Sequence, residues 1–139
     1  MTAFSRIMLE NEEYVKLSHA LSKNRVPMGA LGLSPVNKAH VVHALAEEGK
    51  KCIVLTPDEA SARRLAEDMR AMGSDVLFYP ARDFSFNTSQ GQSREYEQLR
   101  IKTLCSVLKD ECKIVVCSAE SALQLTIPPD ELKKRTFKI

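Results

Sequence analysis

One short segment of the chain has residues near the spacing of a phosphate-binding loop. Such a loop reads Gly, any four residues, Gly-Lys and then Ser or Thr, and it lies between a strand and a helix. Its glycines let backbone N–H groups turn toward the phosphates, its lysine neutralises their charge, and its hydroxyl binds Mg²⁺. In the matching place the chain has Gly32, Leu33, Ser34, Pro35, Val36, Asn37, Lys38 and Ala39. Gly32 and Lys38 keep the pattern, so this segment is a candidate phosphate loop.

The remaining positions of this segment fail the pattern, and each failure has a physical cost. Pro35 has a fixed φ and no N–H to donate to a phosphate. Asn37 replaces the glycine before the lysine, where a side chain would crowd the phosphates, and Ala39 offers no hydroxyl to a metal. We therefore expect negligible binding of Mg-ATP and no cofactor. On the pattern alone, an ordinary turn at Gly32 and a surface lysine at Lys38 are the favoured interpretation.

The composition is typical of one ordinary globular domain. The chain has 139 residues, of which 44% are hydrophobic and 27% charged, and this is enough for a core. Its 20 basic and 18 acidic side chains give a net charge of +2, which is too even to indicate a nucleic-acid surface. No apolar run is long enough to span a bilayer, and the first residues have no signal-peptide core. We expect a cytoplasmic protein without membrane contact.

The spacing of cysteine and histidine gives no metal or redox motif. No C-x-x-C pair exists among the four cysteines, which are Cys52, Cys105, Cys112 and Cys117, and we expect free, reduced thiols without zinc. His40 and His43 stand three apart on one predicted helix and could share a metal. No carboxylate or cysteine at useful spacing joins them, so two ordinary helix histidines are the favoured interpretation.

Short apolar runs alternate with amphipathic patterns along the chain, which predicts a parallel sheet with helices on its faces. The expected strands are 26–31, 52–55, 75–79 and 113–117, and the expected helices are 10–21, 36–48, 57–72, 93–109 and 118–125. A polar loop is expected over 81–92, a final helical turn near 128–132, and the start of another strand at 135–139. The predicted fold class is α/β: a three-layer parallel sheet with flanking helices, similar to one half of a RecA-like phosphate-loop NTPase.

Capping signals indicate where the central helices begin and end. Thr56 is expected to cap the helix that follows the strand 52–55, with Pro57 at its first position and Glu59 completing a capping box. The side chains expected to face the core from this helix are Ala62, Leu65, Met69 and Met72. Gly73 is expected to end it. Ser118 is placed to cap the short helix after the last strand.

Several separate segments together resemble one protein family. The first reads Asp75-Val76-Leu77-Phe78-Tyr79-Pro80-Ala81-Arg82-Asp83-Phe84, the second runs from Ser85 to Ser93-Arg94-Glu95-Tyr96-Glu97-Gln98-Leu99-Arg100, and the third reads Ile114-Val115-Val116-Cys117-Ser118-Ala119-Glu120-Ser121-Ala122-Leu123. Before them stand a failed phosphate loop, a helix, a strand and Thr56-Pro57-Asp58 at the start of the next helix. In this order and spacing, residues 31–132 resemble the N-terminal region of bacterial transcription-repair coupling factors.

The resemblance implies a role in DNA repair. Proteins of this family recognise RNA polymerase stalled at DNA lesions, displace it with a C-terminal ATP-driven translocase, and recruit the nucleotide excision repair machinery. Their N-terminal region is similar to the first domain of excinuclease B (UvrB). This N-terminal region binds excinuclease A (UvrA). The phosphate loop is intact in UvrB and degenerate in the coupling factors, as here. The resemblance therefore implies a non-catalytic scaffold or regulatory module that also contacts other domains of a parent DNA translocase.

The resemblance also implies a domain order. Residues 1–25 would be a helical lead-in, 26–132 the α/β domain similar to UvrB, and 133–139 the truncated start of an inserted domain. The family places the contacts with UvrA mainly in that insert, and we expect the chain to be a piece of a longer protein. Two alternatives remain. One is an active helicase-like ATPase of the excinuclease B type, which the residues at 35, 37 and 39 disfavour, and the other is a freestanding α/β domain that binds another ligand.

Two surface features are candidates for contacts with partners. A candidate interaction surface in the polar loop consists of Arg82, Asp83, Phe84 and Phe86. Its two rings either stack on a base or a partner, or pack back onto the edge of the sheet. The densest basic cluster consists of Lys133, Lys134, Arg135 and Lys138. It could touch DNA phosphates in the parent protein, but a solvated face at a domain junction is the favoured interpretation.

Overall fold

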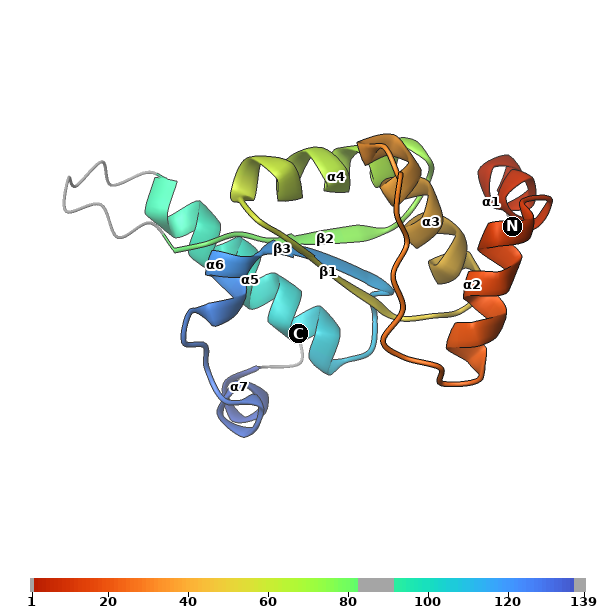
Figure 1. Ribbon diagram of the computed structural model, residues 1–139. Coiled ribbons are helices and arrows are strands. Elements are labelled where there is room, and N and C mark those ends of the chain that lie inside the picture. Colours follow the sequence, from red (N-terminus) through yellow and green to blue (C-terminus); the bar gives the residue numbers. More distant parts are fainter. Residues whose placement is uncertain (1, 83–91, 137–139) are drawn as a thin grey trace.

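A three-stranded parallel sheet forms the centre of the fold, with helices on both of its faces (Figure 1). The computed structural model describes residues 2–82 and 92–136, with the side chains of 92–94 excepted. The elements in chain order are α1 (Ala3–Leu9), α2 (Glu12–Ser22), α3 (Pro35–Glu47), β1 (Cys52–Thr56), α4 (Glu59–Ala71), β2 (Val76–Tyr79), α5 (Gln92–Leu108), β3 (Ile114–Ser118), α6 (Ala119–Leu123) and α7 (Pro129–Arg135). The predicted α/β class, with a parallel sheet and flanking helices, is confirmed.

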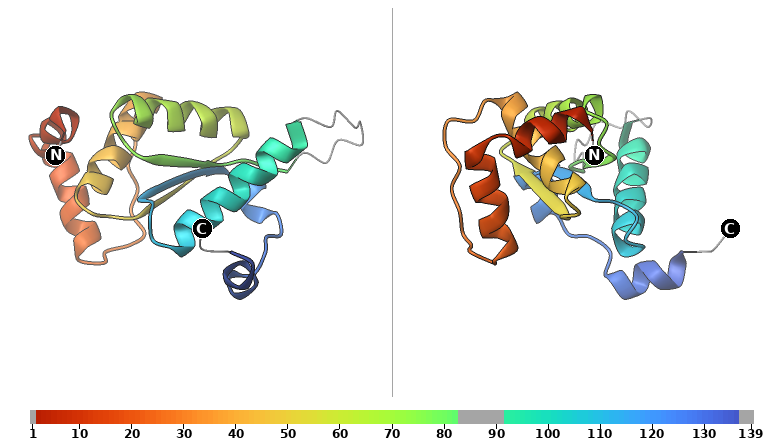
Figure 2. Two further views of the ribbon diagram at one scale, coloured as in Figure 1. Left: turned by 180° about the vertical axis from the view of Figure 1, so that it is seen from behind. Right: turned by 90° about the vertical axis from the view of Figure 1, so that its right-hand side faces the viewer.

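The strands lie in the order β1-β3-β2, so the last strand along the chain is central. Both outer strands pair with β3 in parallel, and at their carboxyl ends Thr56 lies opposite Ser118 and Tyr79 opposite Cys117. Helices α3 and α4 cover one face of the sheet, whereas α5 lies on the other face against β2 (Figure 2). The chain therefore changes faces between α4 and α5. In open α/β sheets ligands bind outside the carboxyl ends of the strands, near such a change.

The hydrophobic core lies between the sheet and the helices α3 and α4. Its buried members are Ala39, Ala46, Ala62, Ala66, Met69, Val76, Phe78, Ile114 and Val116. The alanines let the two helices approach each other and the sheet closely, and Met69 fills the remaining space. Of the α4 residues expected in the core, Ala62 and Met69 are fully buried, whereas Leu65 and Met72 are half-buried at its margin.

The helices after β1 and β3 each begin at a capping side chain. The cap of α6 is the predicted one, whereas the cap of α4 lies two residues later than predicted. Ser118 caps α6, because its hydroxyl accepts the N–H three residues further on at 3.1 Å. The predicted cap of α4 is wrong: Asp58 caps it by accepting the Ser61 N–H at 2.7 Å. Pairing with β3 keeps Thr56 in the sheet, and its hydroxyl donates to the Asp58 carbonyl at 2.7 Å. Glu59 therefore completes no capping box with Thr56.

The segment 26–31, which was predicted as a parallel strand, is not one. It runs from α2 to α3 without joining the sheet (Figure 1), and Leu31 is 97% exposed. Pro27 has no N–H for a strand ladder and Gly29 has no side chain to pack, so this apolar run gains little by pairing. The third parallel strand is β2, which was also predicted.

Both ends of the described chain differ from the prediction. The helix expected over 10–21 is α2, which begins two residues later than predicted because Asn11 caps it by accepting the Tyr14 N–H at 3.1 Å. The helix before it, α1, was not predicted. At the other end Arg135 lies in the last turn of α7, where a strand was expected to begin. The remainder of that expected strand, 137–139, lies outside the described residues.

Candidate functional site

The phosphate-loop positions form a turn and the first turn of α3, and Ser34 accepts two of their backbone N–H groups. Gly32 has a φ of +77°, which favours glycine. The Ser34 hydroxyl caps α3 by accepting the N–H of Asn37 at 3.2 Å, and the Ser34 carbonyl accepts the N–H of Lys38 at 3.0 Å. Pro35 is the first residue of the helix and has no N–H. Two N–H groups that a phosphate would need are therefore taken by Ser34, and a third is missing at Pro35.

The position that would supply a magnesium ligand faces the core instead. Ala39 is fully buried in the cluster between α3, α4 and the sheet. A hydroxyl at this position would lie among apolar side chains and not beside a phosphate. Asn37 and Lys38 are exposed on the opposite side of the same turn. The sequence predicted a missing ligand at 39, and the structure adds that the position points away from solvent.

A cavity of about 470 Å³ lies beside these residues, between α3, α4 and the carboxyl end of β1. Lys38 lines it from α3, and Arg64 and Asp68 line it from α4. Two cations beside one carboxylate leave a weak positive potential, but the backbone cradle that fixes a triphosphate is absent from the neighbouring turn. The cavity therefore offers charge without the donors that would make a nucleotide site.

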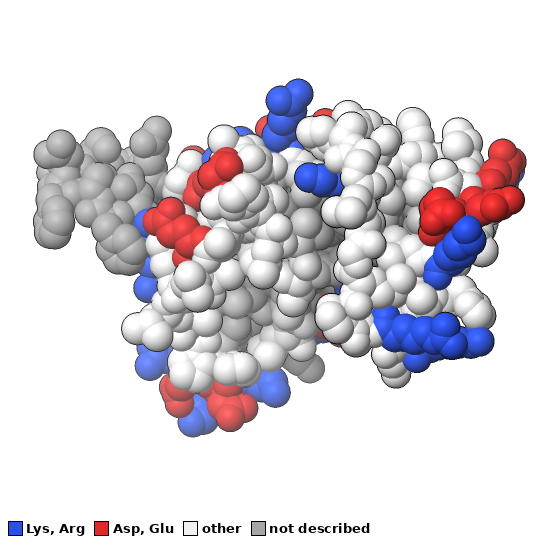
Figure 3. Space-filling view, in the orientation of Figure 1, with Lys and Arg blue, Asp and Glu red and all other residues white. Residues whose placement is uncertain are grey.

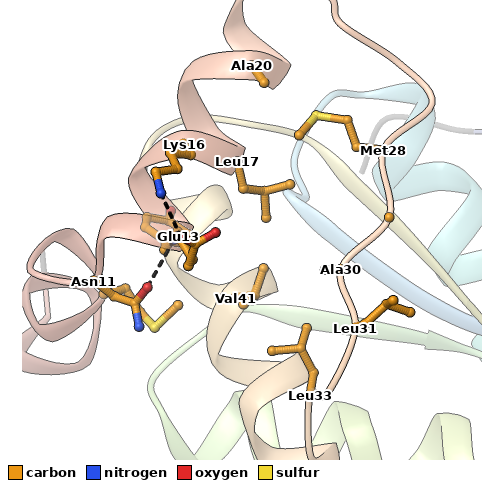
Figure 4. Close-up of a pocket in the computed structure, with 13 residues that line it drawn as sticks. Asn11, Glu13, Lys16, Leu17, Ala20, Met28, Ala30, Leu31, Leu33 and Val41 are labelled. Atoms are coloured by element: carbon orange, nitrogen blue, oxygen red, sulfur yellow. Dashed lines mark hydrogen bonds and ion pairs between the residues drawn. The ribbon is translucent and has the colours of Figure 1, made fainter.

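A second cavity, of about 510 Å³, lies between α2, the segment 28–33 and α3 (Figure 4). Leu17, Met28 and Val41 give it mainly apolar walls. On α2, the Lys16 amine pairs with the Glu13 carboxylate at 2.7 Å. The segment 28–33, part of which was expected in the sheet, forms one wall of this cavity. The cavity can therefore bury apolar surface of a ligand.

The two histidines of α3 hold α1 in place. The His40 Nε2 lies 2.5 Å from the carbonyl oxygen of Phe4. His43 is fully buried, and its two ring nitrogens each lie 2.6 Å from a hydroxyl oxygen, one of Thr2 and one of Ser74. Burial lowers the pKa of His43 below its ordinary value. Within residues 2–82 and 92–136, no three metal-binding side chains come together.

All four thiols are free in the structure. Burial raises the pKa of the thiols of Cys52, Cys112 and Cys117 above the ordinary value. These thiols are therefore protonated at neutral pH and weakly nucleophilic.

Of the candidate interaction surface, the structure places Arg82 alone. Asp83, Phe84 and Phe86 lie outside the described residues. The Arg82 N–H donates to Gln124 Oε1 at 2.7 Å, and its Nε lies 2.9 Å from Glu97 Oε1 as an ion pair, at an angle too poor for a hydrogen bond. This surface therefore begins at the carboxyl end of β2. The phosphate-loop turn lies elsewhere, at the start of α3.

Arg100, which the sequence analysis did not single out, is buried at this same end of the sheet. It is 2% exposed. Its Nη1 donates to the carbonyl oxygen of Pro80 at 2.7 Å and to Gln124 Oε1 at 3.2 Å, and its guanidinium lies 4.1 Å from the centre of the Tyr79 ring. Among residues 2–82 and 92–136, its Nη2 has no hydrogen-bond partner. Burial lowers the pKa of Arg100, as expected of a desolvated cation.

The basic cluster near the end of the chain is an exposed and mixed surface where it is described. Lys134 and Arg135 both pair with Glu131 on α7, at 3.0 and 3.8 Å. Figure 3 shows acidic and basic side chains together over this helix. Lys138 lies outside the described residues.

The fold defines a class: an α/β protein with a three-stranded parallel sheet and flanking helices. No family model matches the chain, and no curated protein or solved structure matches it. Among the described residues, the helices are too short or too polar to cross a membrane.

Proposed function

We propose that this chain is a non-catalytic N-terminal module of a transcription-repair coupling factor. Its parent would displace RNA polymerase stalled at DNA lesions and recruit the nucleotide excision repair machinery in the cytoplasm. The module itself would be a RecA-like, phosphate-loop-type α/β scaffold that does not use ATP. The resemblance of residues 31–132 to that family supports the proposal, and so does the parallel order of β1, β2 and β3 with helices on both faces.

The observation that carries the non-catalytic part is the use of the backbone donors at the start of α3. Ser34 accepts the N–H groups of Asn37 and Lys38 through its hydroxyl and its carbonyl, and Pro35 has none to give. A triphosphate would have to displace the helix cap and would still find no metal ligand at Ala39, because this residue is buried. An active ATPase of the excinuclease B type needs both features, so the scaffold is the better-supported function.

Calorimetry of the chain with Mg-ATP tests this part of the proposal. We expect no saturable binding in the micromolar range. A matched pair of variants identifies any binding that is found: Lys38→Ala removes the loop lysine, and Lys102→Ala removes an exposed lysine of α5. Saturable binding that Lys38→Ala abolishes and Lys102→Ala preserves would overturn the proposal in favour of the excinuclease B type.

The role in repair is tested by capture of UvrA. The chain alone is compared with a form extended through the next small domain of the parent, on the order of 100 residues. We expect the extended form to bind and the chain alone to fail, because the family places this contact in the insert. Equal binding by both forms would move the site to this α/β module, with Arg82 at its edge. Failure of both would contradict the family assignment and favour a freestanding domain.

A further inference from the structure

A cavity of about 450 Å³ lies between α5, the segment that follows α6, and α7. This volume is in the range of small-molecule sites. Leu104, Ile127 and Leu132 contribute apolar walls, and Arg82, Arg100 and Arg135 contribute the cations. The cavity adjoins the carboxyl ends of β2 and β3, since Arg82 follows β2 and the bonds of Arg100 reach Pro80 and Gln124. Open α/β sheets bind their ligands at this end.

Arg100 is a buried cation whose charge is only partly compensated. Its Nη1 is bonded to two neutral oxygens and its face rests on the Tyr79 ring, whereas its Nη2 has no partner in the described part of the chain. The carboxylate of Glu97, which also lines the cavity, is paired with Arg82 at 2.9 Å. A buried cation that lacks an anion is unfavourable, and a desolvated donor forms its strongest hydrogen bonds with an anion. These features favour an anionic ligand.

The cavity walls narrow the chemistry of that ligand. Three arginines face one glutamate in the lining, and Arg135 also shares the Glu131 carboxylate at 3.8 Å. The positive charge left over is small, and among the described residues the Arg82 Nε and the Arg100 Nη2 have no hydrogen-bond partner. A monoanionic carboxylate matches this charge, whereas a phosphate dianion has more oxygens and more charge than the cavity can satisfy. The apolar walls require an apolar body on the ligand.

We infer that this cavity binds a small organic acid, with its carboxylate on the Arg100 Nη2 and its apolar body against Leu104, Ile127 and Leu132. Arg82 and Glu97, whose side chains are 38% and 41% exposed, share the wall with Arg100. The Arg100 Nη2 is itself buried, so the ligand must displace part of this wall to reach it. The site is separate from the turn at the start of α3 and does not depend on the proposed role in repair.

The test is an NMR and calorimetric titration of the whole chain with hexanoate. Hexan-1-ol and inorganic phosphate, at the same ionic strength, are the comparison ligands. We expect saturable binding of hexanoate, with chemical-shift changes at Leu104 and Leu132, and binding of both comparison ligands weaker by roughly tenfold or more. No saturable hexanoate binding up to millimolar concentration would overturn the inference. Equal binding of hexan-1-ol would show that the carboxylate is not recognised, and equal binding of phosphate would refute the ligand class.

A matched pair of variants on α7 keeps the test independent of folding. Arg135→Gln and Lys134→Gln each remove one positive charge that pairs with Glu131, but Arg135 alone of the two lines the cavity. We expect Arg135→Gln to weaken hexanoate binding by roughly three- to tenfold and Lys134→Gln by less than about twofold. Equal losses would attribute binding to general charge and overturn the site. Arg100→Lys, provided that its melting curve shows a folded protein, should weaken binding by roughly tenfold or more because the guanidinium fork is lost.

Discussion

Two regions of the molecule place a cationic side chain beside a cavity: the start of α3, and the carboxyl ends of β2 and β3. The two cations differ in their burial and in the bonding of the groups around them. Lys38 is exposed beside backbone donors that the helix has already used. Arg100 is buried, and its Nη2 has no partner among the residues that the structure describes. The region with a recognisable motif has therefore lost two backbone donors to the helix cap, whereas the region without a motif keeps a buried donor that has no hydrogen-bond partner among the described residues.

This difference shows why a motif and a site are separate things. A phosphate loop depends on where its N–H groups point, and at Ser34 the local cap competes with the phosphate for those groups. The environment of Arg100 depends on three segments that are distant in sequence: the end of β2, α5, and Gln124 after α6. Binding capacity at each place follows from which groups remain unpaired after folding.

The largest expected difference between the two regions appears when one positive charge is removed from each. Arg100→Leu should lower the free energy of unfolding by about 3 kcal/mol, because it leaves the buried Pro80 carbonyl without this donor and removes one of the two donors to Gln124 Oε1. Lys38→Gln should change it by less than about 0.5 kcal/mol, since its side chain is exposed. Urea denaturation followed by circular dichroism measures both. Similar effects of the two changes would contradict the contrast between the regions.

Restoring the missing hydroxyl at 39 should harm stability without restoring a site. Ala39→Thr should cost about 2 kcal/mol of unfolding free energy, because a larger and polar side chain enters the packed cluster of α3 and α4. The exposed neighbour supplies the control: Asn37→Thr should cost less than about 0.5 kcal/mol. Thermal unfolding measures the loss, and calorimetry with Mg-ATP should show no binding by either variant. A stable Ala39→Thr variant that binds Mg-ATP would refute the buried position of residue 39.

The cap of α3 is the next smaller effect. Ser34→Ala should lower the free energy of unfolding by about 1 kcal/mol, since the Asn37 N–H loses its acceptor. Ser34→Asp should keep most of the stability, because a carboxylate accepts the same N–H and favours the positive end of the helix dipole. Chemical denaturation of the three proteins measures the difference. If the alanine variant is as stable as the unmodified chain, the donors of this turn are not held by the cap.

The smallest effect is a pH dependence at the packing of α1 on α3. Burial lowers the folded-state pKa of His43 below its value of about 6.5 in the unfolded chain. Between the two pKa values the unfolded state binds more protons, so stability should fall as the pH is lowered below about 6.5. His43→Gln should flatten this part of the curve relative to His19→Gln, which changes an exposed histidine of α2. Denaturation midpoints from about pH 7.5 to about pH 5 measure the slopes, and equal slopes would rule out His43 as the cause.

Sequence patterns were sufficient for most elements, because those patterns report local energetics. The apolar runs that became β1, β2 and β3 are continuous and bounded by turn residues, as buried parallel strands require. Ser118 and Gly73 marked a helix start and a helix end correctly. The sequence also indicated that the phosphate loop is incomplete, because Pro35 has no N–H and Ala39 has no hydroxyl in any fold.

The tertiary structure alone decided which apolar run joined the sheet and which charges were buried. The run 26–31 has the apolar character of a strand, but Pro27 and Gly29 weaken its pairing, and pairing is a long-range choice that no local pattern contains. Thr56 and Asp58 are both good caps, and it was pairing of Thr56 with Ser118 across the sheet that left the role to Asp58. In the sequence Arg100 is one of many charged residues in predicted helices. The only indication of its burial was its spacing of three residues from Thr103, which is also buried. Its burial and its unused nitrogen follow from packing between segments about twenty residues or more apart, which sequence periodicity cannot specify.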